Sequence, residues 1–215
     1  MNVFHKLTGN LDKAKRAEKA EAKKKEKYTW QQNVALYLHD LLFMLVALMA
    51  VLMLFFRIIV VEGPSMESTL FNGDYMLLVG NMFYKEPAYG DIVVISKQAY
   101  DHGKPIVKRI IATEGQTVDI DFEQGIVYVD GVALDEPYTK TLTTLKEGGA
   151  FPQVVEPGNV FVMGDNRNNS KDSRSIQIGQ VDKRELLGKV IFLMFPGTGM
   201  NSSQQRDFGR VGAVT

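Results

Sequence analysis

The chain has 215 residues, of which 45 % are hydrophobic, and its formal net charge is zero. This length is enough for one membrane anchor and one domain of about 150 residues with a core of its own. The sequence contains no cysteine, which excludes disulfide bonds and thiolate-bound zinc as supports for that domain.

The N-terminal segment is strongly basic. Residues 1–27 hold nine basic and four acidic side chains, a net charge of +5, whereas residues 62–215 carry a net charge of −5. A basic segment beside an apolar span lies on the cytoplasmic side under the positive-inside rule, and it can contact anionic lipid headgroups. We therefore expect a basic cytoplasmic head over residues 1–33. A solvated, partly helical charged tail is compatible with the same composition.

The next segment is long and apolar enough to cross a lipid bilayer. Residues 41–61 read LLFMLVALMAVLMLFFRIIVV and hold a single charge, Arg57. As a helix this stretch would be about 31 Å long, which matches the hydrocarbon core, and Arg57 near its outer end would extend to the headgroups. A cleaved signal peptide has a shorter apolar core and an Ala-x-Ala site, which is missing here. We expect a transmembrane anchor over residues 34–61, with its core at 41–61.

The rest of the chain has strand patterns and few helix signals. Residues 116–120 and 126–129 alternate around residues 122–125, which is typical of a β-hairpin, and Asp130-Gly131 is a further turn signal. A helical turn is indicated only near residues 182–187. The other expected strands are residues 75–79, 92–96, 160–163 and 190–195.

These patterns predict one mainly β domain after the anchor. We expect it to span residues 62–196. Residues 140–158 are polar and contain glycine, so we interpret them as a loop or an excursion from the core. Residues 197–215 are small and polar and are expected to form a C-terminal tail.

Ser65 follows the apolar stretch by four residues, in the run Gly-Pro-Ser-Met-Glu, so we expect it at the membrane surface. As a nucleophile it would need a base for its proton and donors for the oxyanion. Of the three histidines, His5 and His39 fall in the head and beside the span, and only His102 falls in the exported part. The run around Ser65 also lacks the second glycine of a nucleophile elbow. A Ser–His–Asp triad is therefore disfavoured.

A lysine is the alternative base. Its pKa of about 10.4 must fall by ~3.4 units, or about 4.6 kcal/mol, to give a neutral amine at pH 7. Burial among apolar groups can lower a lysine pKa by that amount. In the run Pro-Ile-Val-Lys-Arg-Ile-Ile, Lys108 shares a strand face with Ile106 and Ile110, and Arg109 points the other way. The alternative interpretation is an edge strand with two exposed cations.

A polar run, DNRNNSKDSR, spans Asp165 to Arg174 after the apolar residues 160–163. By itself it is typical of a solvated loop, in which Asp, Asn and Ser side chains bond to their own backbone. Asp172 and Arg174 are spaced for a local ion pair. Such a loop could also support a catalytic group through hydrogen bonds.

Five short motifs occur in one order behind the apolar stretch. Together they resemble the ordered boxes of bacterial type I signal peptidases, the leader peptidases of serine protease family S26, in their single-span, Gram-positive-like form. The stretch VYVDGVALDEPY at residues 127–138 is also similar to theirs. The resemblance covers about residues 35–196, and five boxes in order are specific where each alone is weak. The boxes are GPSMESTL (63–70), GDYMLLV (73–79), GDIVV (90–94), VKRIIA (107–112) and MGDNRNNSKDSR (163–174).

The resemblance implies a mainly β fold, in which a single N-terminal transmembrane helix precedes an antiparallel β domain of the Ser–Lys protease type. It implies that Ser65 is the nucleophile, Lys108 the general base and Ser170 the serine that orients the lysine. The Ser65 amide would donate to the oxyanion, whereas Gly63 lacks the side-chain hydroxyl that some members have at this position. The other supporting residues it implies are an ion pair of Asp172 and Arg174 and a related network of Asp165 and Arg109.

The resemblance also implies the reaction: removal of N-terminal signal peptides from exported preproteins after small residues at −3 and −1, with no metal and no cofactor. We expect signal peptides and the lipid bilayer as partners, the protein-export machinery as a further candidate, and no nucleic acid. The protein would be a single-pass protein of the cell membrane, with a cytoplasmic N-terminus and an extracytoplasmic catalytic domain. The expected substrate-binding residues are Val61, Gly63, Met66, Leu70, Ile106 and Val107, unless these residues are simply core.

Two positions depart from the family pattern. Ser68 stands where proline is usual, and Thr113–Gln116 stands where Leu-Pro-Gly-Asp is usual. Neither change removes a catalytic group, but both can alter loop rigidity. Three alternatives remain open: a self-cleaving Ser–Lys repressor protease, which would carry a DNA-binding head in place of the span, a non-catalytic membrane-tethered β domain, and a paralogue with a narrow set of substrates.

Overall fold

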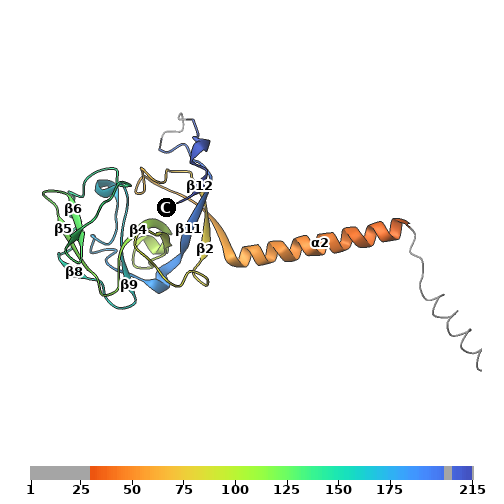
Figure 1. The fold of residues 1–215 in the computed structure, drawn as a ribbon, viewed down its shortest axis with the longest axis horizontal. Helices are drawn as coiled ribbons and strands as arrows, with labels where there is room; N and C mark the ends of the chain where they lie inside the picture. The colour runs from red at the N-terminus through yellow and green to blue at the C-terminus, as the bar shows by residue number, and fades with distance from the viewer. Residues whose placement is uncertain (1–29, 201–204, 215) are drawn as a thin grey trace, which may run out of the picture. The chain divides into compact units, whose positions relative to one another are not determined.

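The computed structural model describes residues 30–200 and 205–214. Most of the expected basic head, residues 1–29, lies outside that description, as do residues 201–204 and 215 of the expected tail. The chain divides into two compact units, residues 1–50 and 51–215. All strands of the described residues belong to the second unit (Figure 1).

One long helix, α2 (Trp30–Phe55), precedes the strands. It has 26 residues, none of them buried, and its most apolar window has a mean hydropathy of 2.4. Its length is about 39 Å, which exceeds the ~30 Å hydrocarbon core of a bilayer. Within the described ranges it is the one helix that is long and apolar enough to cross a membrane.

The helix begins and ends earlier than the expected span of residues 34–61. The chain leaves it at Phe55 and forms β1 (Phe56–Val60), which pairs antiparallel with β2 (Tyr75–Gly80). Consecutive β-branched side chains and the open edge of β2 favour an extended backbone here. Arg57 therefore lies on a strand, opposite Leu78, and not at the outer end of the helix as expected.

The main sheet of the second unit is antiparallel and has eight strands among the described residues. Besides β1 and β2 it contains β3 (Ile92–Ile95), β4 (Ile106–Thr113), β9 (Asn159–Met163), β10 (Val181–Asp182), β11 (Leu186–Phe195) and β12 (Gly212–Ala213). The order is β1-β2-β11-β3-β4-β9-β10, and β12 pairs with β11. Each strand predicted from the sequence in this region is present, with bounds shifted by a few residues. This architecture confirms the mainly β fold with one N-terminal apolar helix.

Strand β4 lies inside the main sheet. It pairs with β3 along one side and with β9 along the other. Lys108 and Arg109 on this strand are only 3 % and 2 % exposed. The alternative of an edge strand with two exposed cations is therefore wrong.

A second sheet has the order β7-β6-β5-β8 and lies at one end of the β domain (Figure 1). It contains β5 (Thr117–Asp121), β6 (Ile126–Val129), β7 (Val132–Ala133) and β8 (Gln153–Val154). The pairing of β5 with β6 confirms the predicted hairpin. Strand β8 lies within the expected loop of residues 140–158. The turn before β5 is closed by the Gln116 side chain, which accepts a hydrogen bond from the Thr113 amide at 2.9 Å.

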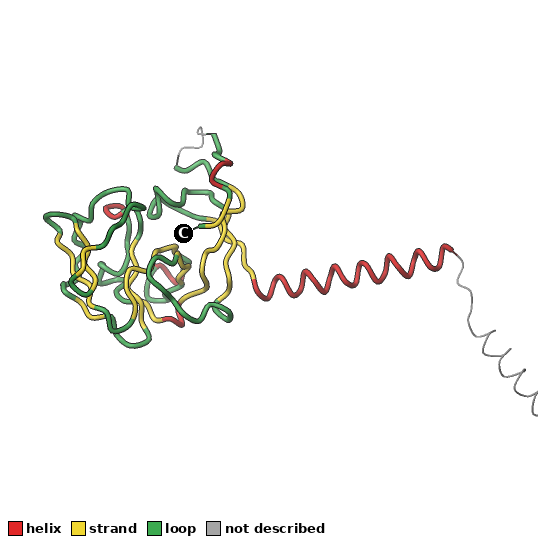
Figure 2. Tube along the Cα trace, in the orientation of Figure 1, coloured by secondary structure: helices red, strands yellow, loops and turns green. Residues whose placement is uncertain are grey.

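Among the described residues after β1, helical structure is limited to short 3-10 turns (Figure 2). These turns are Asp101–Gly103, Arg167–Asn169, Lys183–Glu185 and Phe208–Arg210. The third confirms the helical turn signal near residues 182–187, and it is capped by the Asp182 carboxylate. The fourth, together with β12, shows that the expected polar tail is in part folded onto the domain. Pairing of β12 with β11 and packing of Val214 against the core explain why.

Candidate active site

Ser65 lies in a loop of residues 61–74, called the Ser65 loop below, between β1 and β2. Two side chains of the loop, Met66 and Leu70, are fully buried and belong to a hydrophobic cluster of the core. The amide of Leu70 donates to the Met66 carbonyl at 2.8 Å, which closes a tight turn after Ser65. The apolar side chains thus anchor the loop and leave Ser65 half-buried at the wall of a cavity.

Lys108 reaches Ser65 from strand β4. Its Nζ lies 2.9 Å from Ser65 Oγ and 2.9 Å from the Val107 carbonyl oxygen. As an ammonium group it donates to both. When it loses a proton, its lone pair can accept the hydrogen of the Ser65 hydroxyl. Because β4 is an interior strand, the register of the sheet brings these two residues together across 43 positions of sequence.

Burial lowers the pKa of Lys108 from 10.5 to about 8. Removal of the ammonium from water is the largest cause, and the positive charge of Arg174 acts in the same direction. The carboxylates of Asp172 and Asp165 act against both. The pKa of Lys108 therefore stays above 7, the value at which half of the amine would be neutral at pH 7. About half of the lysine is therefore neutral at pH 8 and about a tenth at pH 7.

Arg109 and Asp165 form a buried ion pair next to Lys108. Arg109 Nε donates to Asp165 Oδ1 at 3.0 Å and its Nη2 donates to Oδ2 at 2.9 Å. Thr69 Oγ1 also donates to Asp165 Oδ2 at 2.5 Å, so this carboxylate ties the Ser65 loop to strand β4. Both ionic side chains are at most 2 % exposed. The network expected for these two residues is present.

Most of the polar run 165–174 is buried rather than solvated, and its exposed residues are Asn168, Asn169 and Lys171. Asp172 and Arg174 form a two-point ion pair, with both hydrogen bonds at 2.8 Å and neither side chain exposed. Arg174 Nη2 also donates to the Arg167 carbonyl at 2.6 Å. Arg167 in turn pairs with Glu136 at 2.6 Å. Charge pairing is what allows a run this polar to lie inside the domain.

Ser170 lies beside the Ser65–Lys108 pair, although it makes no hydrogen bond to the lysine. It lines the same cavity as Lys108, and its Oγ is buried without a hydrogen-bond partner among the described residues. Gly164 makes this approach possible. A Cβ at residue 164 would lie 2.2 Å from Ser170 Oγ and 2.5 Å from the Ser65 carbonyl oxygen, so any larger residue would displace both serines.

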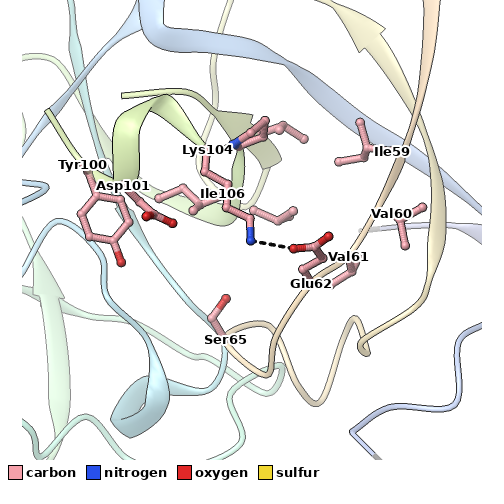
Figure 3. A pocket seen from close by; sticks show the side chains of 12 residues that line it. Ile59, Val60, Val61, Glu62, Ser65, Tyr100, Asp101, Lys104 and Ile106 are labelled. Carbon is pink, nitrogen blue, oxygen red and sulfur yellow. Dashed lines mark ion pairs between the residues drawn. The ribbon is translucent and has the colours of Figure 1, made fainter. Parts of the chain in front are cut away.

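A cavity of about 450 Å³ opens at Ser65 (Figure 3). One wall is formed by residues 59–62 and the other by residues 104–107, with Tyr100 and Asp101 beside the second wall. Most of the lining is aliphatic. Glu62 and Lys104 face each other across the cavity in an exposed ion pair of 2.7 Å, drawn as the dashed line in Figure 3.

A second cavity of about 320 Å³ shares Ser65 with the first and contains Lys108 and Ser170. Of the expected substrate-binding residues, Val61, Ile106 and Val107 line the first cavity, and Gly63 and Ile106 line the second. Met66 and Leu70 line neither. Both are 0 % exposed, so in this structure they belong to the core, as the alternative interpretation had it.

Histidine takes no part in either cavity lining. His102 sits in an exposed 3-10 turn with a positive φ of 54°. His39 lies on α2, and His5 lies outside the described residues. This placement agrees with the argument against a Ser–His–Asp triad.

Two residues at the site were not singled out from the sequence. The Asn166 amide donates to the Ser65 carbonyl at 3.0 Å, and its Nδ2 donates to the Pro64 carbonyl at 3.0 Å. Asn166 and Gly164 both stand in the box of residues 163–174, so their place in that motif was the available signal. Their function depends on a contact with a loop about 100 positions earlier, which no local pattern reveals.

The Ser68 departure coincides with an unusual backbone. Ser68 has a φ of 100°, and its hydroxyl donates to the Tyr138 carbonyl. Proline, the usual family residue here, has a φ fixed near −65° by its ring. The Ser65 loop of this chain therefore has a local conformation that proline could not adopt.

The site joins a serine hydroxyl, a buried amine of lowered pKa and an aliphatic cleft on a β domain. These are the features of a serine hydrolase in which an amine takes the place of histidine. The amide of Ser65 makes no hydrogen bond among the described residues, so it is available as a donor to an oxyanion.

Comparison with known proteins identifies the class more narrowly. Residues 34–195 match the family described as signal peptidase, peptidase S26. A probable signal peptidase I-1 of Synechocystis is 37 % identical over 64 % of this chain and 70 % of its own length. Signal peptidase I S of Bacillus subtilis is 34 % identical over 67 % of this chain and 79 % of its own.

A solved structure was also found. The crystal structure of a signal peptidase I from Enterococcus faecalis has 28 % sequence identity and a TM-score of 0.39, and the match covers 49 % of this chain and 97 % of that one. The chain belongs to the signal peptidase family, peptidase S26, and it is a serine hydrolase of the signal peptidase I type.

Proposed function

We propose that this protein is a membrane-anchored endopeptidase that removes N-terminal signal peptides from exported preproteins with a Ser65–Lys108 dyad. The observation that carries the proposal is the 2.9 Å contact between Ser65 Oγ and the buried Nζ of Lys108. The signal peptidase I relatives support the substrate class. Lysine can act as the base because burial holds its pKa near 8, within reach of neutral pH.

In the acylation step, neutral Lys108 takes the proton of the Ser65 hydroxyl while Oγ bonds to the scissile carbonyl carbon. The ammonium formed then returns this proton to the amide nitrogen, the carbon–nitrogen bond breaks, and the mature protein leaves as an amine. In deacylation, Lys108 takes a proton from water, and the hydroxide attacks the ester. The carbon–Oγ bond breaks, and the proton goes back to Ser65, so the dyad is regenerated.

The oxyanion needs donors that face the carbonyl during both steps. The Ser65 amide is the donor we propose. Gly63 has no side chain to contribute, and its amide already donates to Asn72 Oδ1 at 3.0 Å. A second donor would therefore come from elsewhere in the second cavity, where Asn169, which carries a side-chain amide, is among the lining residues.

The substrate would bind as an added strand. Within residues 30–200 and 205–214, strand β1 ends the main sheet and pairs only with β2, so its other edge is open there. Residues 106–108 of β4 pair with β3, whereas pairing with β9 begins only at Arg109. Both open edges belong to the walls of the first cavity. An extended peptide between them would form main-chain hydrogen bonds on both sides, a common mode of peptide recognition.

The specificity we propose is for small residues at −3 and −1. Side chains of an extended peptide alternate in direction, so positions −1 and −3 point to the same side. The cleft is lined by Val61 on one wall and by Ile106 and Val107 on the other, and these aliphatic side chains would leave room for alanine and few larger groups. Met66 and Leu70 pack in the core with Val61 and Val107 and do not line the cleft.

Helix α2 is proposed as the membrane anchor. Its 26 residues expose apolar side chains, which a bilayer would cover. The basic residues that precede it favour a cytoplasmic N-terminus, and the β domain from residue 56 onward would then be extracytoplasmic. Membrane anchoring would bring the enzyme to signal peptides, which are themselves apolar segments in the bilayer. The protein-export machinery is a candidate partner on the same grounds.

The proposal is tested with the full chain in detergent and a preprotein whose signal peptide ends in Ala-x-Ala. Ser65→Ala and Lys108→Ala should abolish cleavage. Lys108→Arg should also abolish it, because arginine does not lose its proton in this pH range. Lys183→Ala, a surface lysine paired with Glu114, is the matched control and should retain cleavage. Full activity of Ser65→Ala or Lys108→Ala would refute the dyad.

A further inference from the structure

The C-terminal segment, residues 205–214, is bound to the Ser65 loop. Strand β12 adds to β11, and Val214 packs against the cluster that contains Met66 and Leu70. Residues 205–214 are called the C-terminal clasp below. No motif of the sequence falls in this segment, and the proposed dyad mechanism does not use it.

Arg210 makes the principal polar contacts of the clasp. Its Nη1 donates to Asp74 Oδ1 at 3.1 Å and its Nη2 donates to Asp74 Oδ2 at 2.7 Å. The same Nη2 donates to the Thr69 carbonyl at 3.1 Å. The guanidinium carbon lies 4.3 Å from the centre of the Phe71 ring. The Arg210 guanidinium thus contacts three residues of the Ser65 loop.

Asp74 is the residue that closes the Ser65 loop. Its carbonyl accepts from the Val61 amide at 2.9 Å, so the two ends of the loop meet there. Its carboxylate is 0 % exposed and accepts from the Phe71 amide at 2.8 Å and from the Gly197 amide at 2.6 Å. Gly197 is required for this approach, because a Cβ there would lie 2.2 Å from the Asn72 carbonyl oxygen.

Arg210 is the cation that balances this buried carboxylate. A buried charge without a partner is strongly unfavourable, so Asp74 holds its position only while a cation faces it. The Asp74–Arg210 contact is a two-point, charge-assisted pair, which fixes orientation as well as distance. Loss of Arg210 would leave Asp74 with two amide donors and no positive charge, and the turn of residues 69–74 would relax.

The two faces of the Ser65 loop are therefore held by different parts of the chain. On one face, Asn166 of the polar run binds residues 64 and 65, and Asp165 of the same run binds residue 69. The clasp holds residues 69–74 from the other side. We propose that Arg210 is a positioning residue, which sets the place of Ser65 relative to Lys108 by fixing the far end of the loop. This inference rests on the proposed function of the dyad.

The kinetic test uses Arg210→Ala in the full chain, with cleavage of a preprotein measured at 20 °C. Fluorescence and circular dichroism at that temperature establish that each variant is folded. We expect kcat to fall by about tenfold or more with KM nearly unchanged, because misplacement of a reacting atom by less than 1 Å is costly, whereas the proposed peptide cleft contains no clasp residue. Arg210→Lys keeps the charge but loses the two-point geometry, so it should recover part of the loss.

Arg206→Ala is the matched control. Arg206 lies in the same segment, donates to the Pro196 carbonyl at 2.8 Å and covers the Phe195 ring at 4.7 Å, but it contacts no residue of the Ser65 loop. It should retain wild-type kcat. If folded Arg210→Ala also retains wild-type kcat, or if Arg206→Ala loses as much activity, the inference is refuted.

Hydrogen exchange gives a readout that does not depend on substrate. The Thr69 and Leu70 amides donate to the Met66 carbonyl at 3.1 and 2.8 Å, so their exchange reports on opening of the loop. Arg210→Ala should accelerate it by about tenfold, and Arg206→Ala should not. Unchanged exchange in Arg210→Ala refutes the inference. If the wild-type protein cleaves no signal peptide, the proposed function fails, and the exchange result alone decides whether Arg210 holds the loop.

Discussion

Replacement of Lys108 by methionine should stabilise the protein while it abolishes activity. Methionine has a similar length and no charge, so it removes the cost of a buried ammonium group. The pKa of Lys108 is about 8 in the folded protein and 10.5 when exposed, which corresponds to about 3 kcal/mol. The substitution also removes the hydrogen bonds from Lys108 to Val107 and Ser65, which reduces the stabilisation by about 1 kcal/mol. The expected net gain near pH 7 is about 2 kcal/mol.

The expected gain in stability from Lys108→Met depends on pH. Between pH 8 and 10.5 the unfolded lysine binds more protons than the folded one, so the stability of the wild-type protein rises with pH in that window. Below pH 8, Lys108 is protonated in both the folded and the unfolded protein, so the full cost of the buried ammonium group is present. The gain from Lys108→Met should therefore be constant from pH 6 to 7.5 and should disappear as the pH rises to 10.5.

The assay is thermal unfolding of the full chain in detergent, followed by near-ultraviolet circular dichroism from pH 6 to 10.5. A gain of about 2 kcal/mol corresponds to roughly 4–8 °C in Tm for a domain of this size. Lys183→Met, on the surface, should show no comparable pH-dependent gain. A Lys108→Met variant that is no more stable than the wild type at pH 7, or whose gain persists at pH 10.5, would refute the reasoning.

Four further changes test other parts of the site. The kcat/KM for preprotein cleavage should rise with pH and level off above pH 8, where Lys108 is neutral; a flat profile from pH 6 to 10 would contradict this. Asp165→Ala breaks a buried ion pair and should cost about 3–5 kcal/mol in denaturant unfolding. Lys104→Met removes the ion pair with Glu62 across the cleft and should raise kcat/KM by at most about fivefold, with less dependence on salt. Ser68→Pro should lower Tm although proline is usual in the family, because φ is 100° at this residue; an unchanged Tm would count against the loop conformation described.

Much of the β domain was predictable because its signals are local. The hairpin of β5 and β6 follows from alternation around a turn, and both properties are carried by neighbouring residues. The end of α2 was not predictable in this way. Residues 56–60 are as apolar as the helix before them, and only the open edge of β2 makes them a strand. Hydropathy alone therefore placed the end of the apolar helix several residues too late.

In the candidate site, too, some features were predictable from the sequence and others depended on the fold. The ordered boxes singled out Ser65 and Lys108, and the scarcity of histidine after the apolar stretch favoured a lysine base. Met66 and Leu70 could not be assigned to core or cleft by their hydrophobicity, because both environments select apolar side chains. The fold decided that they lie in the core.

The sequence by itself determined a long apolar N-terminal segment, a β-rich domain and a serine and a lysine that stand in the motifs of one family. These conclusions rest on composition, periodicity and order along the chain. Only the tertiary structure decided that Lys108 Nζ and Ser65 Oγ lie 2.9 Å apart, and that Arg210 reaches Asp74 from a segment expected to be a tail. The physical reason is that burial and charge pairing depend on groups 43 and 136 positions apart, which sheet register and core packing bring together.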